Sequence, residues 1–246
     1  MNWLQKKINT RLFGSDLARM VEQNKVPDPA KSLWRLKTMG FNPGSIFDIG
    51  AYEGEFTKLC TAIWPDAKIH AFEGLPEKVI LLNKKLDNKA VVINEVIVGE
   101  SDNGDVKFFA DETSSSVLYS DEVNTKKKII HQKMISLDSY IDAKMIQAPG
   151  LLKIDTQGYE FPILQGCKKN LTSIEVLLIE LNFIEVYHNV TLANEVISFL
   201  AGFDFVVYDI CEIHRRPLDN ALFQIDFLFV KKDSILRKDK RWDIAL

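Results

Sequence analysis

Short apolar runs alternate with amphipathic stretches along most of the chain, a pattern typical of a parallel sheet covered by helices. The runs Ile46 to Ile49, Lys68 to Phe72 and Val91 to Val98 predict three strands. Helical patterns lie between them, over Glu53 to Ile63 and from Pro76 onward. This βαβαβ order predicts right-handed crossovers and a doubly wound sheet.

The second half of the chain resumes the same alternation. Its pattern predicts four strands and two helices: strands over Leu151 to Asp155, Ile174 to Leu181, Phe203 to Ile210 and Gln224 to Val230, and helices over Tyr159 to Cys167 and Leu192 to Leu200. No crossover helix fits between the last two strands. They are therefore expected to form an antiparallel hairpin with a long loop.

The stretch between these halves departs from the alternation. Val106 to Phe109, Ser116 to Tyr119 and Lys128 to Ile135 are strand-like and are joined by polar turns, which predicts an antiparallel β excursion on one side of the sheet. Leu137 to Ile141 then begins a short helical turn, with Asp138 as its expected cap. The predicted fold class is thus α/β, with a mostly parallel doubly wound sheet, an antiparallel last strand and an extra β excursion.

Three segments are expected along the chain: an N-terminal helical segment at 1–40 packed on the core, a doubly wound domain at 41–233 and a basic C-terminal tail at 234–246. The first segment contains two predicted helices, Met1 to Gln23 and Ala30 to Met39. The first helix has an apolar face and several basic residues. It is expected to pack on the domain or on a partner subunit, and contact with a membrane or glycolipid surface is the alternative.

Composition narrows the class of protein. Of the 246 residues, 46% are hydrophobic and 26% are charged, which is typical of a globular domain. The net charge of −3 offers no basic field to nucleic acid, so no such partner is expected. Cys60, Cys167 and Cys211 lie far apart, which indicates core residues in a reducing compartment. No apolar stretch has the length of a signal peptide or a transmembrane helix, and the expected location is cytoplasmic.

A glycine-containing loop follows the first predicted strand, and it predicts a nucleotide-type site at the strand's carboxyl end. Its candidate residues are Asp48, Gly50, Ala51, Tyr52 and Gly54. A dinucleotide loop would carry three closely spaced glycines, whereas this loop has an acid before the first of only two. An acid there repels a pyrophosphate and suits a cationic amino group, which favours S-adenosylmethionine over NAD. An ordinary turn with a solvated Asp48 is the alternative.

The end of the second predicted strand adds an adenosine signal. Glu73, followed by Gly74, can accept hydrogen bonds from both ribose hydroxyls. NAD enzymes place an acid at similar spacing, so Glu73 by itself does not choose the cofactor. The backbone from Val96 to Gly99 is expected to flank the adenine. A helix-capping role before Pro76 is the structural alternative for Glu73.

Lys153 lies inside an apolar strand and requires a partner, for which Asp155 and Glu180 are the candidates. Asp155 ends that strand beside Gln157 and is the first candidate to orient an acceptor hydroxyl or to take its proton. A purely structural ion pair is the alternative. No group of residues predicts a catalytic metal, and Asp155 with Glu180 or Asp209 is the arrangement considered for Mg²⁺.

The histidines are rival candidates for the catalytic base. His188 follows a predicted strand, and His214 lies in the loop before the last one. Both are equally compatible with surface positions. His70, inside the second predicted strand, is expected to be a core residue.

Several segments resemble the signature of FkbM-type methyltransferases: Leu151 to Glu160 with Leu164 and Gly166, Asp48 to Ala51 with Gly54, Ser136 to Tyr140, and Gln224 to Val230. The match runs in order from about Lys37 to Lys232. Met1 to Leu36 matches nothing specific. Phe72 to Pro76 also departs from the family, which more often has proline directly after the acid.

The resemblance implies a class I Rossmann-like methyltransferase fold with S-adenosylmethionine as cofactor. It also implies O-methylation, with a sugar, glycolipid or related secondary metabolite as the acceptor and an oligomer as one arrangement to test. Two alternatives stay open: a cofactor-binding protein without transferase activity, and an NAD-dependent oxidoreductase. The acceptor is bound by loops, whose chemistry is not readable from one sequence.

Overall fold

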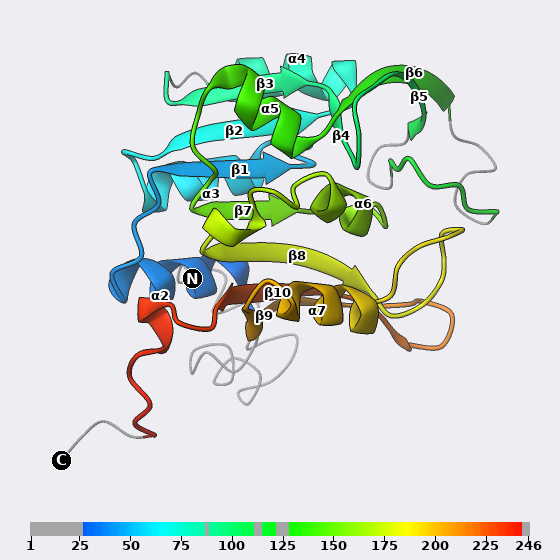
Figure 1. Ribbon diagram of the computed structural model, residues 1–246. Coiled ribbons are helices and arrows are strands. Elements are labelled where there is room, and N and C mark those ends of the chain that lie inside the picture. The colour runs from blue at the N-terminus through cyan, green and yellow to red at the C-terminus, as the bar shows by residue number, and fades with distance from the viewer. Residues whose placement is uncertain (1–26, 87–88, 111–114, 122–127, 243–246) are drawn as a thin grey trace, which may run out of the picture.

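The computed structural model describes residues 27–86, 89–110, 115–121 and 128–242, and a mixed α/β sheet forms its centre (Figure 1). The sheet has the order β3-β2-β1-β7-β8-β10-β9. Its strands are β1 (Ser45–Ile49), β2 (Lys68–Glu73), β3 (Val91–Glu95), β7 (Leu151–Ile154), β8 (Val176–Asn182), β9 (Phe205–Arg215) and β10 (Leu222–Lys231). The first five strands in this order are parallel, and β10 runs antiparallel to both its neighbours, β8 and β9. The predicted fold class is confirmed.

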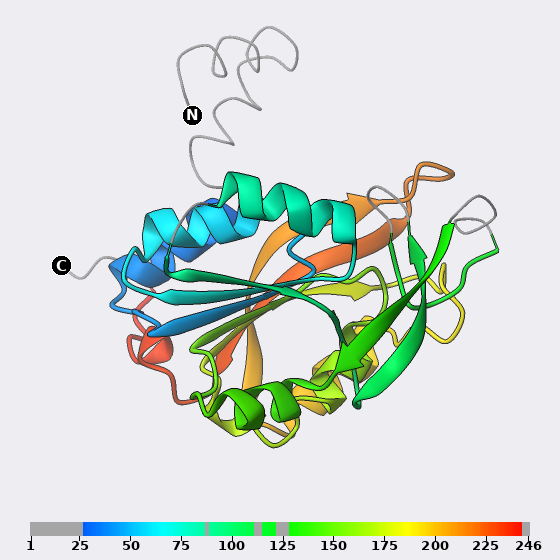
Figure 2. The same ribbon diagram turned by 90° about the horizontal axis from the view of Figure 1, so that it is seen from above.

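Helices cover both faces of this sheet, as Figure 2 shows. One face carries α2 (Pro29–Thr38), α3 (Glu55–Ile63) and α4 (Pro76–Lys85), and the other carries α5 (Leu137–Lys144), α6 (Glu160–Gln165) and α7 (Ala193–Ala201). Two 3₁₀ turns, η1 (Leu171–Ser173) and η2 (Ile235–Arg237), complete the described elements. In the described residues, none of the helices has the length and apolar character needed to cross a membrane.

The core is divided by the sheet because successive strand residues point to opposite faces. In β1, Phe47 packs with residues of α5, α6 and α7, whereas Ile46 packs with residues of α2 and α3. Both side chains are fully buried. Strands buried on both faces read as continuous apolar runs, which explains why the sequence pattern located them.

The helix α2 is part of the domain. Its N-cap Asp28 accepts from Ala30 N at 2.8 Å, and Leu33 and Leu36 are fully buried against the core. The predicted helix from Met1 to Gln23 lies outside the described residues. At the other end, Leu236 of η2 is buried in the same cluster, so the predicted tail begins with residues docked on the core.

The third predicted strand is divided between two sheets, because the chain leaves the main sheet at Val96. The following β4 (Ile97–Val98) joins a second sheet of order β4-β6-β5, with β5 (Asn103–Ala110) and β6 (Lys128–Ile135). The excursion is antiparallel between β5 and β6, as predicted, but parallel between β4 and β6. Ser116 to Tyr119 is not a strand: Ser116 forms a single bridge with Phe109.

Two local expectations are corrected. The cap of α5 is Ser136, whose hydroxyl accepts from Ser139 N at 3.1 Å. Asp138 lies inside the first turn and accepts from the backbone N–H groups of Lys169 and Asn170 instead. The antiparallel hairpin of β9 and β10 is present, but its strands extend further than their apolar runs. The connecting loop is therefore short, at 216–221.

His70 of β2 is a core residue, as predicted. Its side chain is 4% exposed, and Nδ1 lies 2.7 Å from the Tyr140 hydroxyl of α5. Burial lowers the pKa of His70 to about 4, and the positive charges of Lys68 and Lys144 add to this shift. The imidazole is therefore neutral in the folded protein at neutral pH.

This lowered pKa predicts a pH-dependent loss of stability. Because the unfolded chain binds the proton more tightly, the stabilisation is present above pH 6.5 and is lost as the pH falls through about 4. Urea denaturation from pH 7 to pH 4 should show a loss on the order of 2 kcal/mol that His70→Gln does not share. His131→Gln, at an exposed histidine, is the control and should follow the wild type. Parallel pH curves for wild type and His70→Gln would contradict the prediction.

Candidate functional site

A cavity of about 280 Å³ lies at the carboxyl ends of β1, β2 and β7, beside the start of β4. Six of the nine predicted cofactor-binding residues line it: Gly50, Tyr52, Glu73, Gly74, Val96 and Asp155. Much of the remaining wall is apolar and comes from strand ends and the second sheet, with Phe72, Ile97 and Phe108 among its residues. The cavity therefore combines an apolar wall with two carboxylates, those of Glu73 and Asp155.

The loop after β1 requires glycine at its first turn. Gly50 has φ +75°, and a Cβ there would lie 1.9 Å from the backbone oxygen of Asp155. Both Gly50 N and Ala51 N donate to the Phe72 carbonyl, at 3.1 and 3.0 Å. Gly54 also has a positive φ, and its added Cβ would meet Leu82 at 2.9 Å. Ala51 and Gly54 thus belong to the part of the loop that packs on the domain, and they do not line the cavity.

Glu73 links the ends of two strands through its carboxylate. One oxygen accepts from Tyr52 N at 2.8 Å and the other accepts from Leu75 N at 2.8 Å. The residue is 7% exposed, and burial raises its pKa against the effect of these two hydrogen bonds. A carboxylate offers about four lone pairs, so two remain for hydroxyl groups in the cavity. Gln132 Nε2 donates to the Gly74 carbonyl beside Glu73, at 2.8 Å.

Asp48 differs from its predicted placement. Its side chain is fully buried and does not line the cavity. One carboxylate oxygen accepts from the Thr57 hydroxyl at 2.6 Å, and the other lies 3.3 Å from Lys153 Nζ. The even positions of β1 face α3, which directs Asp48 beneath the loop and not into it. The expectation that its carboxylate would be aimed into the loop is therefore corrected.

Lys153 joins the buried acid to the cavity. Its ammonium donates to Gly50 O at 2.7 Å and lies 3.3 Å from Asp48 and 3.4 Å from Asp155. Burial by itself would lower the pKa of Lys153, but the two carboxylates outweigh burial and raise it. Of the two partners predicted from the sequence, Asp155 pairs with Lys153, whereas no ion pair joins Lys153 to Glu180 in the described residues. Asp48 was missed, although it lies directly beside Lys153 in the register of β1 and β7.

Asp155 is the acid that faces the cavity, with a side chain that is 40% exposed. The turn after it is rigid: Glu160 is buried and accepts from Thr156 N and Gly158 N, both at 3.0 Å. Gln157 in this turn has φ +55°, and its amide nitrogen lies 3.5 Å from Asp155 Oδ1. The strand-turn-helix block around Asp155 therefore presents one carboxylate and one amide to the cavity.

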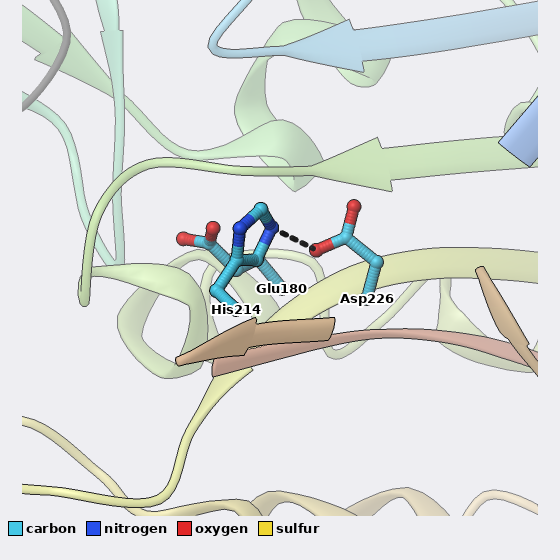
Figure 3. A group of neighbouring side chains, drawn as sticks. All are labelled: Glu180, His214 and Asp226. Carbon is cyan, nitrogen blue, oxygen red and sulfur yellow. Dashed lines mark ion pairs between the residues drawn. The ribbon is translucent and has the colours of Figure 1, made fainter. Parts of the chain in front are cut away.

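The two rival histidines lie outside the cavity lining. His188 is 55% exposed and its Nε2 is 2.9 Å from Asp121. His214 on β9 belongs to a different cluster, shown in Figure 3, in which its Nε2 lies 3.9 Å from Asp226 Oδ1. Together with Glu180, these two residues offer three metal-ligating atoms within 4.8 Å of one another.

This cluster was not predicted from the sequence, which considered Asp155 with Glu180 or Asp209. Asp209 is bound elsewhere, to the Ser32 hydroxyl at 2.6 Å and to Arg35 at 2.8 Å. The informative signal is the register of β10, which places Asp226 directly opposite Glu180. That register could be read only once the strand order was known.

Comparison with known proteins finds FkbM methyltransferases among the similar proteins. The sequence model of the methyltransferase FkbM domain matches residues 48–207. A curated relative, the hexuronic acid methyltransferase AglP of Haloferax volcanii, is 23% identical over 56% of this chain and 55% of its own length. Among solved structures, the methyltransferase FkbM of Methylobacillus flagellatus KT has a TM-score of 0.53 at 16% identity, over 83% of this chain and 49% of that chain. This chain thus spans about half the length of each of these relatives.

The buried ion cluster generates a stability prediction. Lys153→Met leaves Asp48 buried without a counter-charge and should lower the free energy of unfolding by roughly 3–5 kcal/mol. The double variant Asp48→Asn/Lys153→Met removes both charges and should recover a large part of this loss. Urea denaturation measures the wild type, Lys153→Met, the single variant Asp48→Asn and the double variant.

Lys169→Met is the matched control for this experiment, because Lys169 pairs with Asp142 at 2.7 Å on the exposed surface. Its loss should be much smaller than that of Lys153→Met, because solvent screens an exposed pair. Strictly additive losses in the Asp48/Lys153 double variant would contradict the proposed coupling.

Proposed function

This chain belongs to the FkbM methyltransferase family, and from that premise we propose that it transfers a methyl group from S-adenosylmethionine to a hydroxyl of a sugar, glycolipid or related metabolite. The proposal rests on one observation: the carboxylates of Glu73 and Asp155 line the same cavity. When bound there, the cofactor supplies an electrophilic methyl group on a sulfonium centre.

The residues of the cavity fit an adenosine group. Phe72, Val96 and Ile97 provide an apolar surface for a flat base, and Glu73 keeps free lone pairs for the two ribose hydroxyls. Glycine at position 50 lets the loop after β1 pack against the Asp155 backbone, which keeps these two parts of the cavity wall together. These features support the methyl donor, and membership of a methyltransferase family argues against the NAD alternative.

At the other end of the cavity, Asp155 is suited to orient the acceptor hydroxyl and to take its proton. Lys153 orients this carboxylate through an ion pair, since its ammonium lies 3.4 Å from Asp155 Oδ2. Asp48 acts through Lys153 and supports the loop, in place of the direct contact with an amino group that the sequence suggested. His188 lies outside the cavity lining and is not proposed as the base.

The proposed class of acceptor is supported by one relative. The curated relative is named as a methyltransferase of hexuronic acid, a sugar acid, and we extend the sugar class to this chain as a proposal. The Asp155 carboxylate, which lines the cavity and is 40% exposed, is a group that hydrogen-bonds well to sugar hydroxyls.

Cofactor binding provides the first test. Calorimetric titration with S-adenosylhomocysteine should show binding to the wild type, and Glu73→Gln should weaken it at least tenfold because the amide cannot accept on both sides. Glu95→Gln is the matched control, since Glu95 ends the neighbouring strand beside Glu73 but is exposed. The proposal fails if the folded wild type does not bind, or if Glu73→Gln binds as the wild type does.

Methyl transfer is tested separately. Asp155→Asn should lower turnover at least tenfold with little change in affinity for S-adenosylhomocysteine, because it removes the proton acceptor and keeps its shape. The assay uses labelled methyl donor and a fractionated cell extract, with mass identification of the product. His188→Asn should retain turnover.

A reversed result for Asp155 and His188 would show that the base is assigned wrongly. Binding of the cofactor with no transfer to any acceptor by the wild type would support the alternative of a binding protein without transferase activity.

A further inference from the structure

Glu180, His214 and Asp226 come from three neighbouring strands at the edge of the sheet next to the cavity. Glu180 on β8 and Asp226 on β10 are direct cross-strand partners, and His214 on β9 pairs with Gln224, two residues along β10. Their side chains converge, as Figure 3 shows, with His214 Nε2 3.9 Å from Asp226 Oδ1. One oxygen or nitrogen from each lies within 4.8 Å of the other two.

Asp226 carries an acceptor that lacks a partner. Its Oδ1 is buried and receives no hydrogen bond from any described residue. Buried carboxylate oxygens are nearly always hydrogen-bonded, so this atom requires an explanation. The same oxygen lies 3.9 Å from His214 Nε2, and Glu212 Oε1 lies 3.8 Å from that nitrogen.

Glu180 is held in place by its surroundings. It is 6% exposed, and its Oε2 accepts from the amides of Gln157 at 3.0 Å and Gln224 at 2.7 Å. Neutral amide donors fix the orientation of a carboxylate without neutralising it, and such outer groups are common around metal-binding carboxylates.

The charge of the cluster is not balanced within the described part of the chain. Neither Glu180 nor Asp226 forms an ion pair there with a lysine or arginine. The nearby Lys153 is already shared between Asp48 and Asp155. Two neighbouring buried carboxylates with no permanent counter-charge are costly, and either shared protons or a divalent cation would offset them.

We propose that Glu180, His214 and Asp226 form a binding site for a first-row divalent cation such as Mn²⁺. One imidazole with two carboxylates is a mixed nitrogen and oxygen set that suits these ions. Three protein ligands leave further positions open for water or a substrate oxygen, which is the pattern of catalytic sites. His214 is 38% exposed, so the ion has a route from solvent.

The site lies on the acceptor side of the cavity. Gln157 joins the two, because its amide nitrogen donates to Glu180 at 3.0 Å and lies 3.5 Å from Asp155 Oδ1. A hydroxyl bound to the ion has a lowered pKa, and its proton passes to Asp155 while the ion keeps its charge. This role rests on the proposed methyl transfer, whereas binding of the cation does not.

The test is a titration of the full-length, chelator-treated protein with Mn²⁺, with free Mn²⁺ followed by electron paramagnetic resonance. The wild type should bind one ion. Asp226→Asn and His214→Ala should each weaken binding at least tenfold, with folding checked by circular dichroism. The control pair is His131→Ala and Asp105→Asn, at an exposed imidazole and carboxylate 2.6 Å apart, and both should bind as the wild type does.

Wild-type affinity no tighter than that of the two cluster variants would overturn the proposal and leave a cluster that shares protons only. Titration of the same samples with S-adenosylhomocysteine separates this inference from the proposed function. Binding of S-adenosylhomocysteine without Mn²⁺ binding overturns the cation site alone. Binding of Mn²⁺ without S-adenosylhomocysteine supports the cation site and overturns the proposed methyl transfer.

Discussion

The arrangement of the site depends on one buried ammonium group. Lys153 contacts Asp48 from the neighbouring strand, Asp155 at the end of its own strand and the backbone oxygen of Gly50. A lysine is stable in the interior only with such partners, and a buried carboxylate depends equally on its cation. The interaction therefore holds the loop after β1 in one conformation and presents the Asp155 carboxylate to the cavity.

Around this group, the carboxyl edge of the sheet has two chemically different sides. Toward β2 and β4 the surface is apolar and includes a single carboxylate, that of Glu73, which suits a nucleoside. Toward β8, β10 and β9 it carries carboxylates, amides and an imidazole, which suit a cation or a hydroxylated acceptor. Asp155 and Gln157 lie at the boundary, where a methyl donor and its acceptor would meet.

The antiparallel strand β10 brings together the polar residues on the β8, β10 and β9 side of this edge. It lies between β8 and β9 and pairs with both, so that residues distant in the sequence become cross-strand neighbours. The second sheet makes a comparable contribution to the first side, because Ile97 and Phe108 close the apolar wall of the cavity. The parallel strands β2, β3, β7 and β8 and the end of β1 lie within the residues that match the FkbM family model, 48–207.

The sequence by itself determined the fold class and six residues of the cavity lining. Apolar periodicity, glycines at strand ends and an acid such as Glu73 are local signals, readable without knowing which strands pair. Strand order and register are set by tertiary packing, and they decided the rest. Asp48 became a buried partner of Lys153 because β1 and β7 align the two residues. Glu180 and Asp226 meet only because β10 pairs antiparallel with β8, a contact that no local pattern encodes.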